Sequence, residues 1–206
     1  LGICSDLKLI ESAFKRFLFQ ISIVLSFVIL NNILLFDTRI DLLDQFLEIE
    51  LINYLFVSFC ILIVLNGSNF IDGLNTLNIG YFFYIGLILL ILVVNNEIIY
   101  DQFSLLYFII FIFLIFLLNF FNKIFLGDSG SYLFGFIFSV LLIEMYNLNS
   151  NLSPFFIILL LWYPCYETLF SIIRKNIFNR SPMNPDSNHL HQLIFFYLKK
   201  KFNLKI

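Results

Sequence analysis

The sequence predicts an all-α membrane protein, a polytopic bundle with about six transmembrane helices. Hydrophobic residues make up 61% of the chain, charged residues only 13%, and 29 residues are Phe. A soluble domain of 206 residues has no interior large enough to bury that many apolar side chains. The apolar residues also fall into six runs, and the cations gather in alternate loops between them. We therefore expect most of the surface to face lipid.

The predicted spans are the six apolar runs, taken in order along the chain. They occupy residues 17–36, 51–65, 79–94, 103–118, 132–143 and 154–170. The first has the roughly 20 residues that a helix needs to cross the hydrocarbon core. The others are shorter, so we expect their helices to extend into the flanking polar residues or to tilt little. Six helices buried in a soluble protein is the competing interpretation, which fails because no polar residues remain to cover them.

The loops between these runs divide the charges by sign. They are residues 1–16, 37–50, 66–78, 95–102, 119–131, 144–153 and 171–206. The odd-numbered loops contain eleven of the 12 cations, namely Lys8, Lys15, Arg16, Lys123, Arg174, Lys175, Arg180, Lys199, Lys200, Lys201 and Lys205. The even-numbered loops contain only Arg39 and are otherwise acidic. By the positive-inside rule the odd-numbered loops are cytoplasmic.

Other features of the composition exclude several classes of function. A net charge of −2, with no basic stripe interleaved with aromatic residues, argues against a nucleic-acid partner. The three cysteines, Cys4, Cys60 and Cys165, lie far apart and predict neither a disulfide framework nor a zinc site. Residues 38–49 alternate loosely between apolar and polar types, so both a short hairpin and an interfacial helix fit them. No chemistry is predicted there.

The first polar stretch with chemical potential contains Asn66, Asn69, Asp72 and Asn75. On a helix, a spacing of three residues keeps side chains roughly on one face. An Asp followed by Gly, as at Asp72, also caps helices and makes turns, which is the structural alternative. The recurrence of four oxygen-bearing side chains favours a binding face.

The second polar stretch, residues 127–131, combines the carboxylate of Asp128 with small residues whose backbone amides can approach a phosphate closely. A carboxylate near a bilayer is usually paired, capping a helix or functional. Lys123 lies five residues before Asp128 and could balance the charge of a pyrophosphate. Ordinary anchoring at the membrane surface is the alternative for this lysine.

The third polar stretch ends in His189 and His191. Residues two apart lie on opposite sides of a helix, so these imidazoles converge only in an extended or loop conformation. Pro182 and Pro185 predict such a loop just upstream. Neutral imidazoles suit a metal and charged ones a phosphate, whereas a solvated loop needs neither.

Taken together, these stretches resemble the polyprenyl-phosphate N-acetylhexosamine-1-phosphate transferases. The family's Asn- and Asp-rich motif looks like residues 66–75, and its Gly-Asp-x-Gly-Ser motif is similar to residues 125–131. Its late Pro-Asp and His-x-His loop is similar to residues 185–191, and the span before that loop looks like residues 164–174. Residues 2–8 stand where the family has an aspartate pair. The resemblance covers essentially the whole chain.

The resemblance implies a reaction in which a polyprenyl (undecaprenyl) phosphate attacks the β-phosphorus of a UDP-sugar and releases UMP. It implies a Mg²⁺ requirement, with Mn²⁺ as the alternative ion, and a site on the cytoplasmic face of a bacterial inner membrane. A homodimer is compatible with it. The pathway would be cell-wall or lipopolysaccharide and other surface-polysaccharide synthesis. The fold implied is a roughly ten-span bundle, so residues 1–206 would be one transferase domain lacking N-terminal spans, and the last C-terminal span could also be missing.

Roles for individual residues also come from the resemblance. Asp128 would hold the metal, and Asp72 would line the metal and nucleotide cleft with Asn69 and Asn75. Asn66 belongs to the same substrate-binding motif, Lys123 would meet the pyrophosphate, and His189 and His191 would contact the diphosphate or the sugar. Asp6 would orient or activate the lipid phosphate.

Two departures from the family pattern bear on activity. Ser5 replaces the first carboxylate of the aspartate pair, so a mechanism that uses that group as a base is in doubt. Attack by an already ionised lipid phosphate needs no strong base. Asn75 and Thr76 stand where many members have Asp and Gly.

Two other functions remain as alternatives. An inactive homologue with a scaffold role fits the changes at Ser5 and Asn75. A transporter would need polar residues near the middle of its spans. Asp72, Asp128 and the histidines instead cluster at one interface, which disfavours transport.

Overall fold

A computed structural model describes residues 1–10, 12–179 and 189–202 of the chain. The elements of these residues are all helices, which confirms the predicted fold class. They are α1 (Gly2–Asp6), α2 (Ala13–Leu30), α3 (Asp41–Leu47), α4 (Glu50–Ile71), α5 (Leu77–Val94), α6 (Gln102–Phe120), α7 (Gly127–Leu148), α8 (Pro154–Leu160), α9 (Trp162–Ile177) and α10 (Leu190–Phe202).

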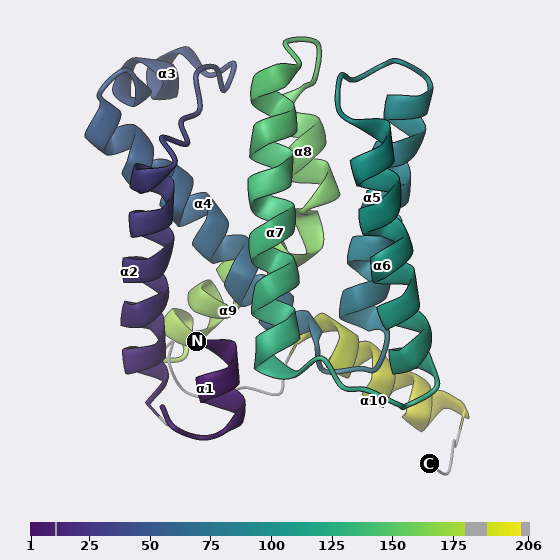
Figure 1. The fold of residues 1–206 in the computed structure, drawn as a ribbon. Coiled ribbons are helices and arrows are strands. Elements are labelled where there is room, and N and C mark those ends of the chain that lie inside the picture. Colours follow the sequence, from purple (N-terminus) through teal and green to yellow (C-terminus); the bar gives the residue numbers. More distant parts are fainter. Residues whose placement is uncertain (11, 180–188, 203–206) are drawn as a thin grey trace.

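Five of these helices, α2, α4, α5, α6 and α7, are long and apolar enough to cross a membrane. They stand side by side in Figure 1. As expected from the short apolar runs, several helices extend into flanking polar residues: α4 continues to Ile71 and α7 already begins at Gly127. Polar caps begin two of them, since Ser12 accepts a hydrogen bond from the backbone of Lys15 and Asp101 accepts one from Ser104.

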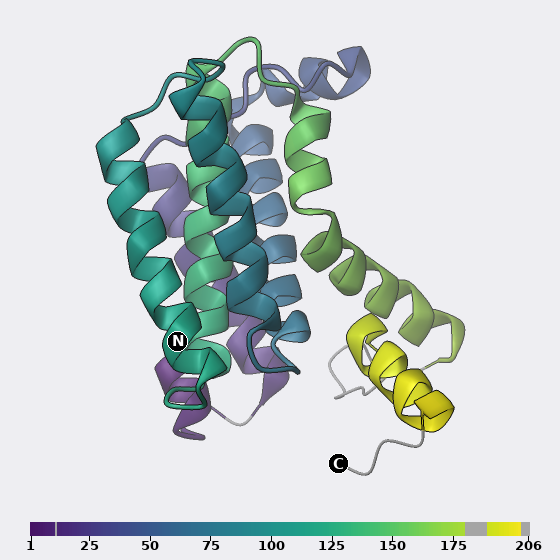
Figure 2. The ribbon, with the colours of Figure 1, turned by 90° about the vertical axis from the view of Figure 1, so that its right-hand side faces the viewer.

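The sixth predicted span is bent. Helices α8 and α9 meet at an angle of 76°, and they make a sixth span if the pair is counted as one. Pro154 at the start of α8 and Pro164 in the first turn of α9 both occupy positions where a helix tolerates proline. Figure 2 shows α9 leaving the bundle obliquely and approaching α10.

The two ends of the bundle carry different elements (Figure 1). We call one the basic end; it holds α1, α10 and the loops at residues 72–76 and 121–126. The acidic end holds α3 and the loops at residues 31–40, 95–101 and 149–153. Because α3 is a short helix, residues 41–47 are helical and do not form the hairpin that was the other interpretation of residues 38–49.

Helix α4 is the centre of the packing and contacts α2, α7 and α9. A Cβ atom at Gly67 would lie 2.0 Å from the carbonyl oxygen of Pro164, so only glycine lets α4 and α9 approach this closely. Apolar side chains from α4 to α8 fill the main core, around Phe82, Phe138 and Leu142. This packing fixes the end of α4, where the predicted site residues lie.

Candidate active site

The Asn- and Asp-rich motif straddles the end of α4. Asn66 and Asn69 lie on the helix, Asp72 follows its last residue, and Asn75 lies in the turn before α5. The expected common helical face therefore extends only to the first two. Asn69 Nδ2 donates to the Tyr132 hydroxyl on α7 (3.2 Å), whereas Asn66 Nδ2 donates to a carbonyl of its own helix (2.9 Å).

Two asparagines, one in the last turn of α6 and one just after it, form hydrogen bonds with the turn between α4 and α5. Asn75 Nδ2 donates to Asn122 Oδ1 (2.6 Å), and the backbone N–H of Thr76 donates to Asn119 Oδ1 (2.7 Å). Thr76 has a φ of +68°, which is rare for a β-branched residue. The buried Asn119 amide oxygen accepts the N–H of Thr76 and so holds the turn in this conformation. Asn119 was not among the residues predicted for the site.

Asp72 is half-buried beside this turn. The pKa of its carboxyl is raised to about 6. Burial is the main cause, the nearby Ser131 hydroxyl and Asn78 amide act against it, and the charges of Asp128 and Asp6 add to it. Three carboxylates contributed by distant segments therefore share one electrostatic environment.

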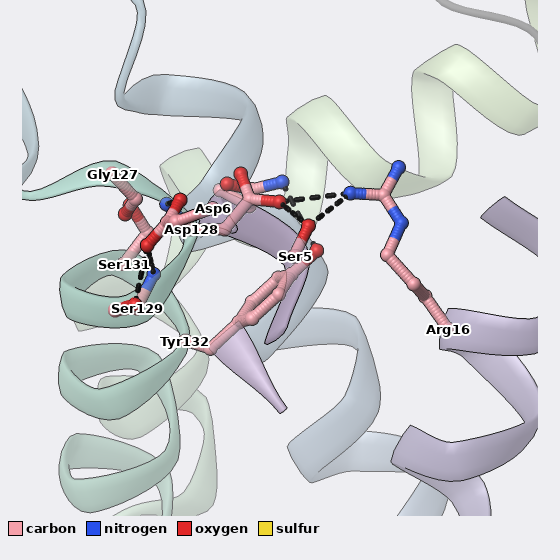
Figure 3. A network of polar contacts seen from close by, with 9 residues as sticks. Ser5, Asp6, Arg16, Gly127, Asp128, Ser129, Ser131 and Tyr132 are labelled. Carbon is pink, nitrogen blue, oxygen red and sulfur yellow. Dashed lines mark hydrogen bonds and ion pairs between the residues drawn. The ribbon is translucent and has the colours of Figure 1, made fainter. Parts of the chain in front are cut away.

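Asp6 caps helix α7, as Figure 3 shows. Its carboxylate accepts hydrogen bonds from the backbone N–H groups of Asp128 (3.0 Å) and Ser129 (3.1 Å) and from the Ser129 hydroxyl. Burial raises the pKa of Asp6, but these hydrogen bonds outweigh it and hold the pKa below its usual value. Gly127 has a φ of +60°, and a Cβ there would meet the Asp6 carboxylate at 3.0 Å. The carboxylate therefore takes the place of an N-cap side chain for α7.

Asp128 forms an ion pair with Arg16 at the start of α2 (Figure 3). Arg16 Nη1 lies 2.8 Å from Asp128 Oδ2. The Ser5 hydroxyl donates to the same carboxylate oxygen and accepts from Arg16. Sequence reasoning treated Arg16 only as a cytoplasmic cation, because its partner is 112 residues away and no local pattern distinguishes a site cation from an anchoring one.

The two histidines lie at the start of α10, and both side chains are buried. His189 precedes the helix and His191 lies in its first turn, so the expected non-helical conformation holds for the first of the pair. Their rings are parallel within 3°, with centroids 6.0 Å apart, and His189 also stacks on Phe70 of α4. The pKa of His191 lies below its usual value. Burial lowers this pKa most, the charge of Glu167 raises it, and His189 lowers it again. His191 Nε2 faces Gly73, which brings this segment to the α4–α5 turn.

Two predicted features remain without support from contacts. Lys123 is exposed in the loop between α6 and α7, so its pyrophosphate role stays a prediction. Asp186, Pro182 and Pro185 lie outside the described residues.

The carboxylates at the basic end are the groups that could hold a magnesium ion. Among the described residues, no group of three or more His, Cys, Asp or Glu side chains is placed to hold a metal ion. Mg²⁺ in phosphoryl-transfer sites usually takes one or two carboxylates and completes its shell with substrate phosphates and water. Asp128 and Asp72 fit that smaller set, and both contacts of Asp128 with Ser5 and Arg16 use Oδ2 alone.

A cavity of about 530 Å³ adjoins this polar cluster. Ser129, Gly130 and Tyr132 line one part of it, and apolar side chains of α2, including Ile23 and Val24, line another. Polar residues of α7 and apolar residues of α2 therefore line one cavity at the basic end.

Comparison with known proteins gave consistent matches. The sequence model of glycosyl transferase family 4 matches residues 1–146. The chain is 30% identical over 212 residues to a probable undecaprenyl-phosphate N-acetylglucosaminyl 1-phosphate transferase of Bacillus subtilis, covering 100% of this chain and 58% of that protein. It is 30% identical over 170 residues to the decaprenyl-phosphate N-acetylglucosaminephosphotransferase of Mycolicibacterium smegmatis, covering 72% of this chain and 41% of that protein.

A third relative is the undecaprenyl-phosphate alpha-N-acetylglucosaminyl 1-phosphate transferase of Thermotoga maritima, 32% identical over 71 residues, or 34% of this chain and 23% of that protein. No solved structure matches the chain. The chain thus spans at most 58% of the length of these relatives.

Proposed function

Because the chain belongs to glycosyl transferase family 4, we propose that the protein transfers a sugar 1-phosphate from a UDP-sugar to a polyprenyl phosphate and releases UMP. An N-acetylhexosamine 1-phosphate is the proposed cargo and undecaprenyl phosphate the proposed acceptor. The reaction would take place at the basic end, on the cytoplasmic face of a bacterial inner membrane, as the first membrane step of a cell-wall or surface polysaccharide.

One observation supports this proposal above the others: Asp128, Arg16 and the capped N-terminus of α7 meet beside a lipid-facing bundle. Phosphoryl transfer depends mainly on positioning and on neutralising charge, which such a group can supply. Arg16 can pair with a diphosphate oxygen, and Asp128 can hold a metal ion beside it. The first backbone amides of α7 are already bound by Asp6, so they position the helix and do not bind the substrate.

The bond changes follow from the substrates. An ionised oxygen of the polyprenyl phosphate attacks the β-phosphorus, and the bond from that phosphorus to the bridging oxygen breaks, so UMP leaves with the electron pair. No proton has to be removed from the attacking oxygen. We propose that Asp128 and Asp72 would hold a Mg²⁺ ion, which neutralises diphosphate charge when bound. The guanidinium of Arg16 is proposed to pair with a phosphate oxygen of the substrate.

The other residues position these groups. Asp6 orients Asp128 by capping α7, which is a more specific role than the expected contact with the lipid phosphate. Asn69 and Asn75 line the nucleotide side of the α4–α5 turn. His189 and His191 contact the diphosphate or the sugar, from the side of α9 and α10.

The test uses membranes that contain the protein, undecaprenyl phosphate, Mg²⁺ and a panel of labelled UDP-sugars. We expect UMP release and labelled lipid with one sugar, both lost when the metal is chelated. A relative of known activity in matched membranes is the positive control. If that control works and no sugar gives a product here, the inactive-homologue interpretation, motivated by Ser5, replaces the proposed reaction.

A further inference from the structure

Helix α9 contains a buried carboxylate to which the mechanism above assigns no role. Glu167 is only 1% exposed, although it lies in a helix that packs against the apolar core. A carboxylate so deeply buried is costly unless partners satisfy it. The sequence offered no reason to single it out beyond its place near the end of a predicted span.

Both oxygens of Glu167 are used by the segment that begins α10. Oε2 lies 3.0 Å from His189 Nδ1, and Oε1 accepts the backbone N–H of Leu190 at 2.7 Å. Because an ionised carboxylate can only accept hydrogen bonds, Nδ1 of His189 carries a proton. The Leu190 amide belongs to the first turn of α10, where a negative charge is favoured.

One turn earlier on α9, Tyr163 supports the other histidine. Its hydroxyl lies 3.3 Å from His191 Nδ1. Tyr163 and Glu167 are four residues apart and so share one face of α9. That face therefore holds both imidazoles, whose rings are parallel.

We propose that Glu167 is a positioning residue for His189: it fixes the proton on Nδ1 and ties the start of α10 to α9, so that Nε2 is the nitrogen left for a substrate. This inference rests on the proposed function for the identity of that substrate, an anionic diphosphate-sugar. In many metal sites a carboxylate likewise orients a histidine through its second ring nitrogen. Loss of such a carboxylate lowers metal affinity or activity by about 10- to 100-fold.

Three variants separate orientation of the ring from anchoring of the helix. Glu167→Gln keeps an oxygen that can accept from the Leu190 amide, but it removes the negative charge that Glu167 presents to His189. Glu167→Ala loses both, and Glu167→Asp keeps the charge. Glu144→Gln makes the same chemical change at an exposed position of α7 and is the matched control.

Two measurements apply to the protein in membranes: kcat and KM for the UDP-sugar, and hydrogen exchange of the α10 amides. We expect Glu167→Gln to lower kcat by about 10- to 100-fold with a smaller change in KM and nearly unchanged exchange. Glu167→Asp should recover part of the loss, and only Glu167→Ala should speed exchange. Glu144→Gln should match the parent protein in both.

Full activity of Glu167→Gln would overturn the proposal, as would loss of activity accompanied by equally fast exchange in the Gln and Ala variants, which indicates a purely structural role. The exchange measurement needs no substrate. If the parent protein transfers no sugar, the proposed function fails, and unchanged exchange in Glu167→Ala would separately refute the anchoring by Glu167.

Discussion

Carboxylates at the two ends of the bundle differ in the partners they bind. At the acidic end they bind neighbours in sequence. Asp44 accepts hydrogen bonds from Thr38, six residues away, and Asp101 accepts one from Ser104, three residues away. These contacts cap turns and helices locally.

At the basic end the carboxylates join distant segments. Asp6 binds Ser129 across 123 residues, and Asp128 binds Arg16 across 112. A local cap forms with its helix and needs no other part of the fold, whereas these contacts exist only after the three helices α1, α2 and α7 have assembled. Sequence separation of the partners therefore distinguishes a site from a cap more clearly than the density of charged residues does.

The sharpest test of this difference compares one Asp→Asn change at each end. Asp128→Asn should lower turnover by about 100-fold or more, because it removes the carboxylate proposed to hold the Mg²⁺ that neutralises the reacting phosphates, while membrane insertion survives. Asp101→Asn should leave turnover unchanged, since Asn caps a helix about as well as Asp. Transfer assays on membranes with equal amounts of each variant measure both. Unchanged turnover in Asp128→Asn would refute the proposed metal-binding role.

A second test compares the arginines. Arg16→Ala should lower turnover by about 10-fold or more, because a charge-assisted contact to phosphate is lost. Arg39 donates to the carbonyls of Ser150 and Leu152, so Arg39→Ala should affect thermal stability and leave the rate of transfer per folded molecule unchanged. Equal transfer rates for Arg16→Ala and Arg39→Ala would contradict the proposal that only the arginine at the basic end takes part in the reaction.

A third and smaller effect is expected at the cap of α7. Asp6→Ala leaves the amides of Asp128 and Ser129 without their acceptor, which should destabilise the helix start by about 1 kcal/mol. Turnover should fall while the KM for the lipid phosphate changes little, because Asp6 acts through α7. A large rise in that KM, with kcat preserved, would instead support direct binding of the lipid by Asp6.

The fold was largely predictable, because apolar runs indicate the membrane-spanning helices and the placement of cations in alternate loops indicates their order across the membrane. The ends of the helices were not. Helix α4 continues past Leu65 through Gly67 and Ser68 because both residues are buried against neighbouring helices, a tertiary effect that a hydropathy run does not report. The 76° bend after α8 has a local signal in Pro164, which has no N–H to donate to the carbonyl of Leu160. That carbonyl accepts from the Tyr81 hydroxyl on α5 instead, a contact that the sequence does not reveal.

The candidate site was predictable where its residues form motifs. Asp72, Asp128 and the histidines do gather at the basic end. Arg16 and Glu167 were missed, because each is ordinary in its own segment and acquires a role only through a partner elsewhere in the chain. Their detection needs the packing of α2 and α9, which composition does not encode.

The smallest expected effect concerns Ser5, which bridges Asp128 and Arg16 at the position where the family resemblance predicts a second carboxylate. Ser5→Asp would lose the hydrogen bond that the hydroxyl donates to Asp128 and add a negative charge beside it, but Arg16 can pair with both groups. We therefore expect turnover to stay equal or to rise by up to about threefold, the effect of one partly exposed charge pair. Ser5→Ala, which removes both hydrogen bonds and adds no charge, is the control, and transfer rates at saturating Mg²⁺ are the measurement. A clear loss in Ser5→Asp alone would mean that the serine is required for the geometry of the Asp128–Arg16 pair, so that this chain has replaced a carboxylate pair by a carboxylate held by an arginine.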